Sequence, residues 1–233
     1  MAKNLYILIV FIFSIGCVKK EMVVQQTNYP PLEEQDSFQY LALGDSYTIG
    51  EGVNESERWP VVLIDRLKQE GIPFNVPKII ATTGWTTTDL IAAIDKEDLA
   101  TFNLVSLLIG VNNQYRGYDF NIYKAEFRDL LIKAIKLAGN DPSKVFVVSI
   151  PDYSVTPFAQ SRNPQKIASE IDAYNKFNKD VAIELGVAYF DITPISRNAA
   201  NDDGLLAEDN LHPSAKMYHE WVDMIYPEIK SKF

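Results

Sequence analysis

The sequence predicts an α/β fold, in which a parallel β-sheet is covered by helices on both faces. Short apolar segments alternate with longer amphipathic ones from Phe38 to the end of the chain. Two of the apolar segments, LVSLLI at 104–109 and KVFVVSI at 144–150, are almost continuously hydrophobic, as expected of strands buried on both faces. No internal repeat or composition shift divides residues 38–233, so we expect one domain there.

Each predicted strand is followed by a predicted helix. The strands are Tyr40–Leu43, Lys78–Ala81, Leu104–Ile109, Lys144–Ile150 and Ala188–Ile192. The helices are Trp59–Glu70, Thr88–Lys96, Ile122–Leu137, Pro164–Leu185 and Pro213–Ile229. Apolar residues in the fourth helix recur every three or four positions, which indicates one buried face. Glycines close several helices, and Pro60 and Pro213 suit first-turn positions. This alternating order predicts a parallel sheet.

Composition excludes several classes of protein. The chain carries 31 acidic and 22 basic residues, for a net charge of −9, which argues against binding to nucleic acid. Its one cysteine, Cys17, rules out an intrachain disulfide bond. With only two histidines, His212 and His219, a zinc site built from His and Cys is not expected.

The N-terminus has the pattern of an export signal. Lys3 precedes an eleven-residue apolar run, Leu5–Ile15, which would span roughly half of a ~30 Å hydrocarbon core. Residues 1–16 are therefore predicted to be a signal peptide.

The segment ending at Cys17 resembles a bacterial lipoprotein signal, although Ser14 replaces the usual leucine. That resemblance implies a lipid anchor on Cys17 in the cell envelope. The alternative is an ordinary secretory signal with an incidental cysteine. Residues 17–37 are predicted to be a flexible tether between the membrane and the domain.

Ligands of parallel sheets bind beyond the carboxyl ends of the strands, so motifs directly after strands are candidate sites. Four segments meet this criterion: Gly44-Asp45-Ser46, the stretch 82–87 around Gly84, the stretch 109–114 around Asn112, and 208–213 with Asp209 and His212. Each also has a structural interpretation, because these residue types form turns and helix caps. Ser46 does not lie in a Gly-x-Ser-x-Gly elbow, since Thr48 stands where the second glycine would be.

Taken together, the four segments supply the groups that acyl transfer needs. Ser46 is the candidate nucleophile. His212 is the candidate base, and Asp209, three residues earlier, can orient its ring. The backbone N–H of Gly84 and the side-chain amide of Asn112 are candidate hydrogen-bond donors. His219 is expected to be a surface or packing residue.

The four motifs, in this order from Tyr40 to the last helix, resemble those of the SGNH (GDSL-type) hydrolases. The resemblance implies a flavodoxin-like, three-layer α/β/α sandwich with a five-stranded parallel sheet. It implies a Ser46–His212–Asp209 triad and an oxyanion hole made by Ser46, Gly84 and Asn112, with no metal or organic cofactor. Two residues depart from the family pattern, since Tyr47 stands where many members have leucine and Asn113 where many have aspartate. Neither difference removes a catalytic group, and both are expected to reshape the acyl pocket.

Two rival functions stay open at this point. One is a catalytically silent, membrane-tethered domain on the same fold that binds glycans. The other is a flavodoxin-like nucleotide binder, which the absence of a Gly-x-Gly-x-x-Gly cradle after the first strand disfavours. For an enzyme, the substrate is open among lipid esters, thioesters and acetylated carbohydrates. Aromatic residues near the motifs (Tyr47, Trp85, Tyr115 and Tyr118) and Arg116 are candidates for contacting it.

Overall fold

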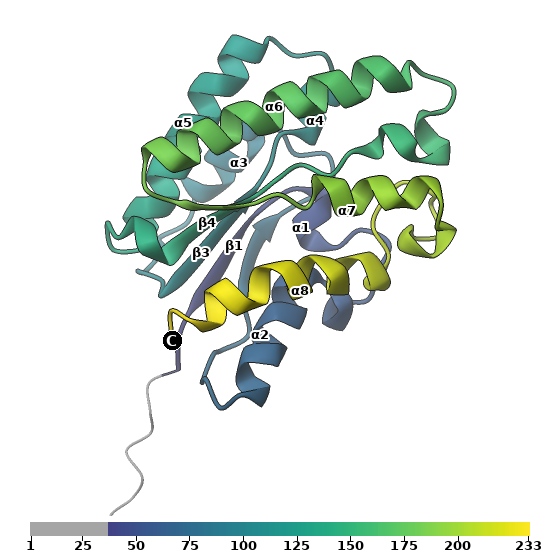
Figure 1. The fold of residues 1–233 in the computed structure, drawn as a ribbon. Helices are drawn as coiled ribbons and strands as arrows, with labels where there is room; N and C mark the ends of the chain where they lie inside the picture. The colour runs from purple at the N-terminus through teal and green to yellow at the C-terminus, as the bar shows by residue number, and fades with distance from the viewer. Residues whose placement is uncertain (1–36) are drawn as a thin grey trace, which may run out of the picture. The chain divides into compact units, whose positions relative to one another are not determined.

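A computed structural model describes residues 37–233 of the chain and contains a five-stranded parallel sheet (Figure 1). The strands lie in the order β2-β1-β3-β4-β5. Their bounds are β1 Tyr40–Gly44, β2 Lys78–Ala81, β3 Leu104–Leu108, β4 Val145–Val148 and β5 Ala188–Phe190. All five predicted strands are present, and their bounds differ from the predicted ones by at most two residues. The predicted signal peptide, Cys17 and the tether up to residue 36 lie outside the described residues.

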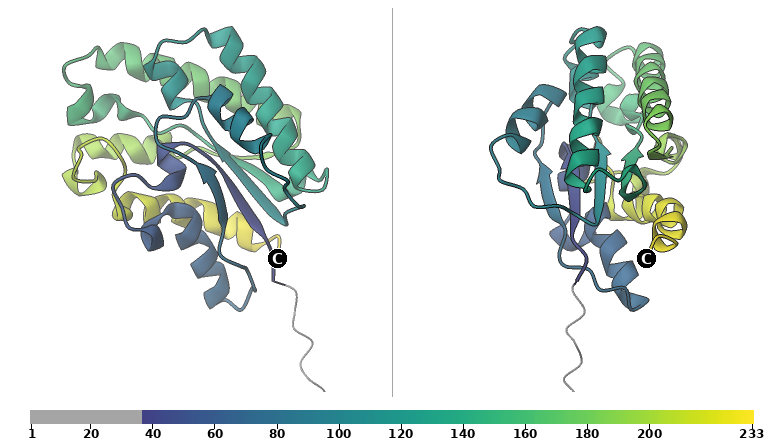
Figure 2. Two further views of the ribbon diagram at one scale, coloured as in Figure 1. Left: turned by 180° about the vertical axis from the view of Figure 1, so that it is seen from behind. Right: turned by 90° about the vertical axis from the view of Figure 1, so that its left-hand side faces the viewer.

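Helices cover the sheet on both faces. The five longer helices are α2 Trp59–Gln69, α3 Thr87–Ile94, α5 Phe120–Leu137, α6 Pro164–Glu184 and α8 Ala215–Lys230. In Figure 1, α2 and α8 lie below the strands and α3, α5 and α6 lie above them, and α2 packs directly against α8. The two further views in Figure 2 show the same separation. The predicted three-layer α/β/α sandwich is therefore confirmed.

The core fills both spaces between sheet and helices because the central strands have no solvent-facing side. Every residue of β1 and β3 is buried. Below the sheet, the ring of Phe146 in β4 packs 6.2 Å from Trp59 of α2 and 5.6 Å from Phe190 of β5. Above it, Tyr123 of α5 packs 4.3 Å from Tyr174 of α6. Burying one such side chain contributes about 1.5–3 kcal/mol to folding.

Three short helices were not predicted: α1 Ser46–Ile49, α4 Val111–Tyr115 and α7 Thr193–Arg197. Each has four or five residues, which is too short to produce a helical periodicity in the sequence. The prediction that Pro213 occupies the first turn of the last helix was wrong. Pro213 precedes the N-cap Ser214, which accepts a hydrogen bond from Met217, and it pairs with Leu206 in an isolated antiparallel bridge.

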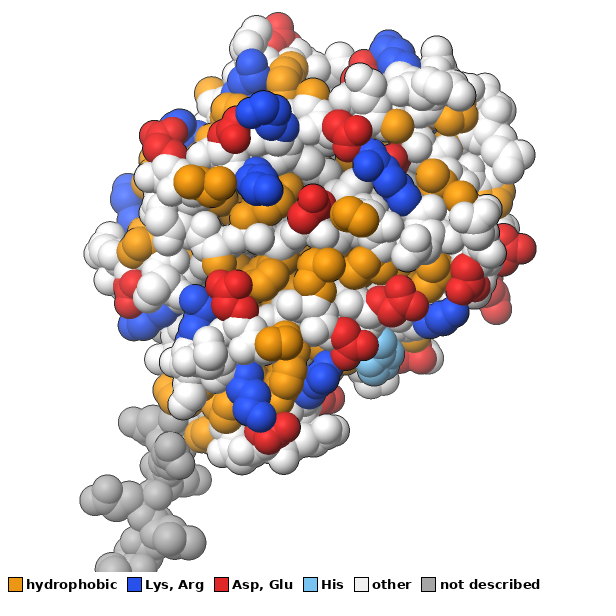
Figure 3. All heavy atoms as spheres, viewed as in Figure 1, with side chains coloured by type: hydrophobic (Ala, Val, Ile, Leu, Met, Phe, Trp, Pro, Cys, Tyr) orange, Lys and Arg blue, Asp and Glu red, His pale blue; other side chains and the backbone are white. Residues whose placement is uncertain are grey.

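The described surface carries both signs of charge. On the face shown in Figure 3, basic and acidic side chains are interspersed, and hydrophobic groups gather in a band between α6 and α8. No helix in the part of the chain that the structure describes is both long and apolar enough to span a bilayer.

Candidate active site

The four predicted motifs meet in one pocket of about 220 Å³ beyond the carboxyl ends of the strands. Ser46 is the first residue of α1, two positions after the end of β1, and Gly84 lies in the loop after β2. Asn112 lies in α4 after β3, and His212 lies in the loop before α8. All four line the pocket, together with Tyr47, Thr83, Val111, Tyr115, Tyr153, Phe158 and Leu211.

Asp209 and His212 form a tight pair at one side of this pocket. The Nδ1 atom of His212 lies 2.5 Å from Oδ2 of Asp209. The other carboxylate oxygen, Oδ1, accepts the backbone N–H groups of Leu211 and His212, each at 2.9 Å. Partial burial opposes ionisation of Asp209, but the ring and these N–H groups outweigh it and lower its pKa below the ordinary value. The pair therefore fixes the imidazole through Nδ1, and Nε2 is the ring nitrogen left for chemistry.

The turn that presents Ser46 is built by its neighbours. Asp45 is the N-cap of α1 and accepts the N–H of Tyr47 at 3.1 Å. A Cβ atom at position 44 would collide with the side chain of Thr48, so only glycine fits before this turn. Burial raises the pKa of Asp45 to about 7, although the Tyr47 N–H favours its ionised form. Ser46, only 4% exposed, is thus held at the start of a helix, where backbone N–H groups have no intrahelical partner.

The two candidate donors, Gly84 and Asn112, are each held by a hydrogen bond. Gly84 has φ +86°, a left-handed conformation that favours glycine, and its carbonyl accepts Nη2 of Arg116 at 2.6 Å. The side-chain nitrogen of Asn112 donates to the carbonyl of Trp85 at 2.9 Å. An amide nitrogen carries two hydrogens, so this bond orients the group and leaves a second N–H available to the pocket. Trp85 therefore contributes its backbone and not its ring, which does not line the pocket.

The two residues that depart from the family pattern, Tyr47 and Asn113, lie in different parts of the structure. Tyr47 lines the pocket, with its ring 5.6 Å from that of His212. Asn113 does not line it and is buried, accepting the N–H of Thr87 at 3.1 Å and donating to its hydroxyl at 2.8 Å. The expectation that Asn113 shapes the acyl pocket was wrong, because its amide ties α4 to the start of α3.

The sequence did not predict the part of the pocket lining that follows β4. Tyr153 and Phe158 come from two short 3₁₀ turns, Tyr153–Val155 and Pro157–Ala159, and both line the pocket. Their position after a strand was a usable signal, but this segment contains none of the four motifs by which the other parts of the site were identified. His219 is exposed on α8, as predicted. The described residues contain no group of three or more His, Cys, Asp or Glu side chains that could hold a metal ion.

Comparisons with known proteins identify the family and the fold. Residues 42–219 match the model of the GDSL-like lipase/acylhydrolase family. No curated protein matches the chain. Among solved structures, TesA is 20% identical, with a TM-score of 0.65 over 84% of this chain and 99% of that one. The esterase EstA from Pseudoalteromonas sp. is 18% identical, with a TM-score of 0.60 over 84% and 98% of the two chains.

A third similar structure is Axe2, an acetylxylan esterase from Geobacillus stearothermophilus. It is 19% identical, with a TM-score of 0.62 over 82% of this chain and 94% of that one. At these identities the structural likeness shows the fold, whereas the family match spans most of the chain and includes all four motifs. The chain belongs to the GDSL-like lipase/acylhydrolase family and is a hydrolase of ester bonds.

Proposed function

We propose that this protein hydrolyses esters through an acyl-enzyme on Ser46, with His212 as base and Asp209 as the residue that orients it. The observation that carries the proposal is that His212, held by Asp209, lines the same 220 Å³ pocket as Ser46, Gly84 and Asn112. Nucleophile, oriented base and donors are the three components of acyl transfer.

The proposed reaction has two steps. His212 Nε2 takes the hydroxyl proton while Ser46 Oγ bonds to the ester carbonyl carbon, and the carbonyl oxygen becomes an oxyanion. The N–H groups of Ser46 and Gly84 and the Asn112 amide donate to that oxyanion. The C–O bond to the alcohol then breaks, and the alcohol leaves with the proton from His212. Water repeats the sequence on the acyl-enzyme and releases the acid.

Labelling with a fluorophosphonate probe tests this proposal against the rival of a silent binding domain. The probe phosphonylates an activated serine with loss of fluoride, so the intact mass should rise by one adduct and digestion should locate it on the peptide containing Ser46. Hydrolysis of p-nitrophenyl acetate should be lost in parallel. An unlabelled, folded protein with no esterase activity would favour the silent domain.

The oxyanion role of Asn112 gives a prediction that differs from a binding role. Asn112→Ala should lower kcat by about 10²–10³, because the lost donor meets charge that develops only in the transition state. KM should change little, since the ground-state carbonyl depends less on that donor. Steady-state kinetics on p-nitrophenyl acetate would measure both constants.

Asn113 provides the matched control for this prediction. Asn113→Ala leaves the Thr87 N–H without its partner and should lower the free energy of unfolding by about 1–3 kcal/mol. Its effect on kcat should be far smaller than that of Asn112→Ala. A rise in KM alone in Asn112→Ala would instead mean that Asn112 binds substrate uniformly and that other groups form the oxyanion hole.

We also propose that the protein is exported and held at a bacterial membrane by a lipid on Cys17. The support is the sequence alone: Lys3, the apolar run Leu5–Ile15 and the single cysteine that follows it. Such an anchor would keep the enzyme near substrates of the cell envelope.

Cys17→Ser should shift the protein from the membrane fraction to the soluble fraction, or block its processing, because the thiol that would carry the lipid is absent. Fractionation of expressing cells followed by immunoblotting measures this distribution. Mass spectrometry of the mature N-terminus of the unsubstituted protein is the independent check. An unmodified N-terminus cleaved at another position would contradict the lipid anchor.

A further inference from the structure

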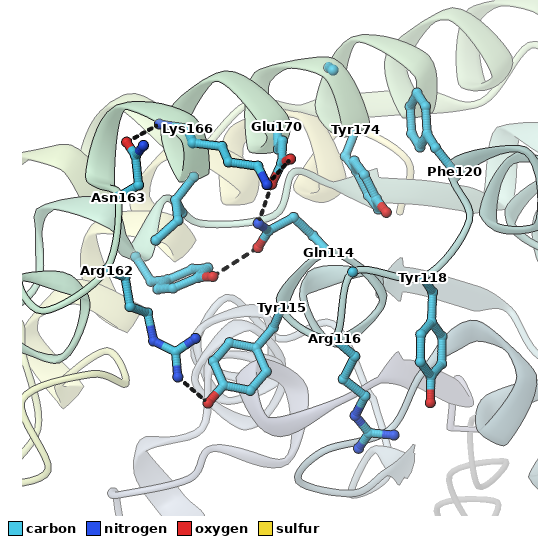
Figure 4. Close-up of a pocket in the computed structure, with 14 residues that line it drawn as sticks. Gln114, Tyr115, Arg116, Tyr118, Phe120, Arg162, Asn163, Lys166, Glu170 and Tyr174 are labelled. Carbon is cyan, nitrogen blue, oxygen red and sulfur yellow. Dashed lines mark hydrogen bonds and ion pairs between the residues drawn. The ribbon is translucent and has the colours of Figure 1, made fainter.

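A second cavity adjoins the active-site pocket. It is an open trough of about 670 Å³ between α4 and α6, and its lining shares Tyr115 and Tyr153 with the pocket of Ser46. Figure 4 shows the trough. We call it the basic trough and define it by the six lining residues that matter below: Tyr115, Arg116, Tyr118, Tyr153, Arg162 and Lys166.

The two arginines of the basic trough differ from the others in the chain. The sequence has six arginines. The other four, Arg58, Arg66, Arg128 and Arg197, each form an ion pair with a carboxylate. Within residues 37–233, Arg116 and Arg162 form none. In a chain with 31 acidic and 22 basic residues, two arginines that line one cavity without an ion pair need a specific reason.

The one carboxylate in the described lining of the trough does not neutralise them. Glu170 accepts the side-chain N–H of Gln114 at 2.8 Å and lies 3.6 Å from the ammonium group of Lys166. Gln114 in turn accepts the hydroxyl of Tyr153 at 2.9 Å and is buried. Glu170 is therefore engaged by Gln114 and Lys166, and neither Arg116 nor Arg162 has a carboxylate within ion-pair distance in the described residues.

Neutral contacts hold both guanidinium groups at the border of the pocket. Arg162 lies 4.4 Å over the ring of Tyr115 and donates to its hydroxyl oxygen at 2.6 Å. Arg116 donates to the carbonyl of Gly84, the residue proposed to bind the oxyanion. A guanidinium has five N–H donors, so each arginine keeps several for a ligand. Tyr118 is 48% exposed and presents its ring in the same lining, whereas the ring of Tyr115 lies under Arg162.

We propose that the basic trough binds the alcohol portion of the ester and that this leaving group bears a carboxylate or a phosphate. The inference rests on the proposed function, because it places the reacting carbonyl at Ser46 and the alcohol beyond Tyr115. Arginine forks match the geometry of both anions, and the exposed ring of Tyr118 suits a sugar ring or a short chain. An acylated acidic sugar and an acylated glycerophosphate share this chemistry.

Two matched substrate pairs test the proposal and separate the two sources. The first pair is acetylated glucuronate against acetylated glucose, and the second is 1-acylglycerol 3-phosphate against 1-acylglycerol. In the pair that resembles the natural substrate, kcat/KM should be higher for the anionic ester than for the neutral one. Arg162→Gln should reduce that preference about five- to tenfold, and added salt should weaken it in the unsubstituted protein.

Arg128→Gln is the control, because Arg128 lies on α5 outside the trough and pairs with Glu184. It should leave the anion preference unchanged. The proposal is supported if one anionic ester is preferred and if Arg162→Gln, but not Arg128→Gln, lowers that preference. The preferred ester then shows whether the anion is a carboxylate or a phosphate. Equal rates within both pairs, or a preference that Arg162→Gln does not alter, would overturn it.

A binding measurement separates this inference from the proposed function. Glucuronate and glycerol 3-phosphate can be titrated calorimetrically into folded Ser46→Ala, with and without Arg162→Gln. Binding of one of them that weakens about five- to tenfold with Arg162→Gln would support the anion site even if Ser46 proved not to be the nucleophile. Ester hydrolysis without binding of either anion would leave the proposed function standing and reject the anion site.

Discussion

Ser46→Ala is expected to reduce ester hydrolysis by about 10⁴-fold or more and to abolish fluorophosphonate labelling. The substitution removes the atom that forms the acyl-enzyme and changes little else. The cap of α1 is the side chain of Asp45, which accepts the Tyr47 N–H and is retained. The backbone N–H of position 46 also persists, so the proposed oxyanion hole should stay intact. Hydrolysis of p-nitrophenyl acetate by the purified variant measures the loss.

The control for this experiment is the fold of the variant itself. Thermal unfolding followed by circular dichroism should give a midpoint close to that of the unsubstituted protein, because no core side chain is shortened by more than one hydroxyl. Comparable turnover in a folded Ser46→Ala protein would remove Ser46 from the mechanism. The Asp209–His212 pair would then have to activate a different nucleophile, such as water.

The sheet was predictable from sequence because its signal is local and strong. Segments such as 104–109 are apolar on both faces, and glycines mark the ends of the helices between them. The placement of Ser46, Gly84 and Asn112 followed from the same reasoning, since parallel strands bring their carboxyl ends to one edge. Once the strands were assigned, the meeting of these residues in one pocket required no further information.

What could not be predicted depends on contacts between residues far apart in sequence. Arg116 reaches the carbonyl of Gly84 across 32 positions, and Arg162 reaches the hydroxyl of Tyr115 across 47. Neither contact has a sequence motif, because side-chain direction at a helix end or in a loop is set by packing. The position of Pro213 was missed for a related reason, since its bridge to Leu206 comes from the folded loop and not from helix-start preferences.

His212→Ala should nearly eliminate both turnover and fluorophosphonate labelling at neutral pH, whereas His219→Ala should do neither. His212 lies in the pocket lining and is held by Asp209, so its loss removes the proposed base, at a cost of about 10⁴–10⁶ in kcat. His219 is exposed on α8, only seven positions away, and is the matched control. Comparing hydrolysis rates and labelling of the two folded variants isolates the role of the ring from the general effect of losing a histidine. If His219→Ala were as damaging as His212→Ala, the Asp209–His212 pair would be structural and the triad would have to be redrawn.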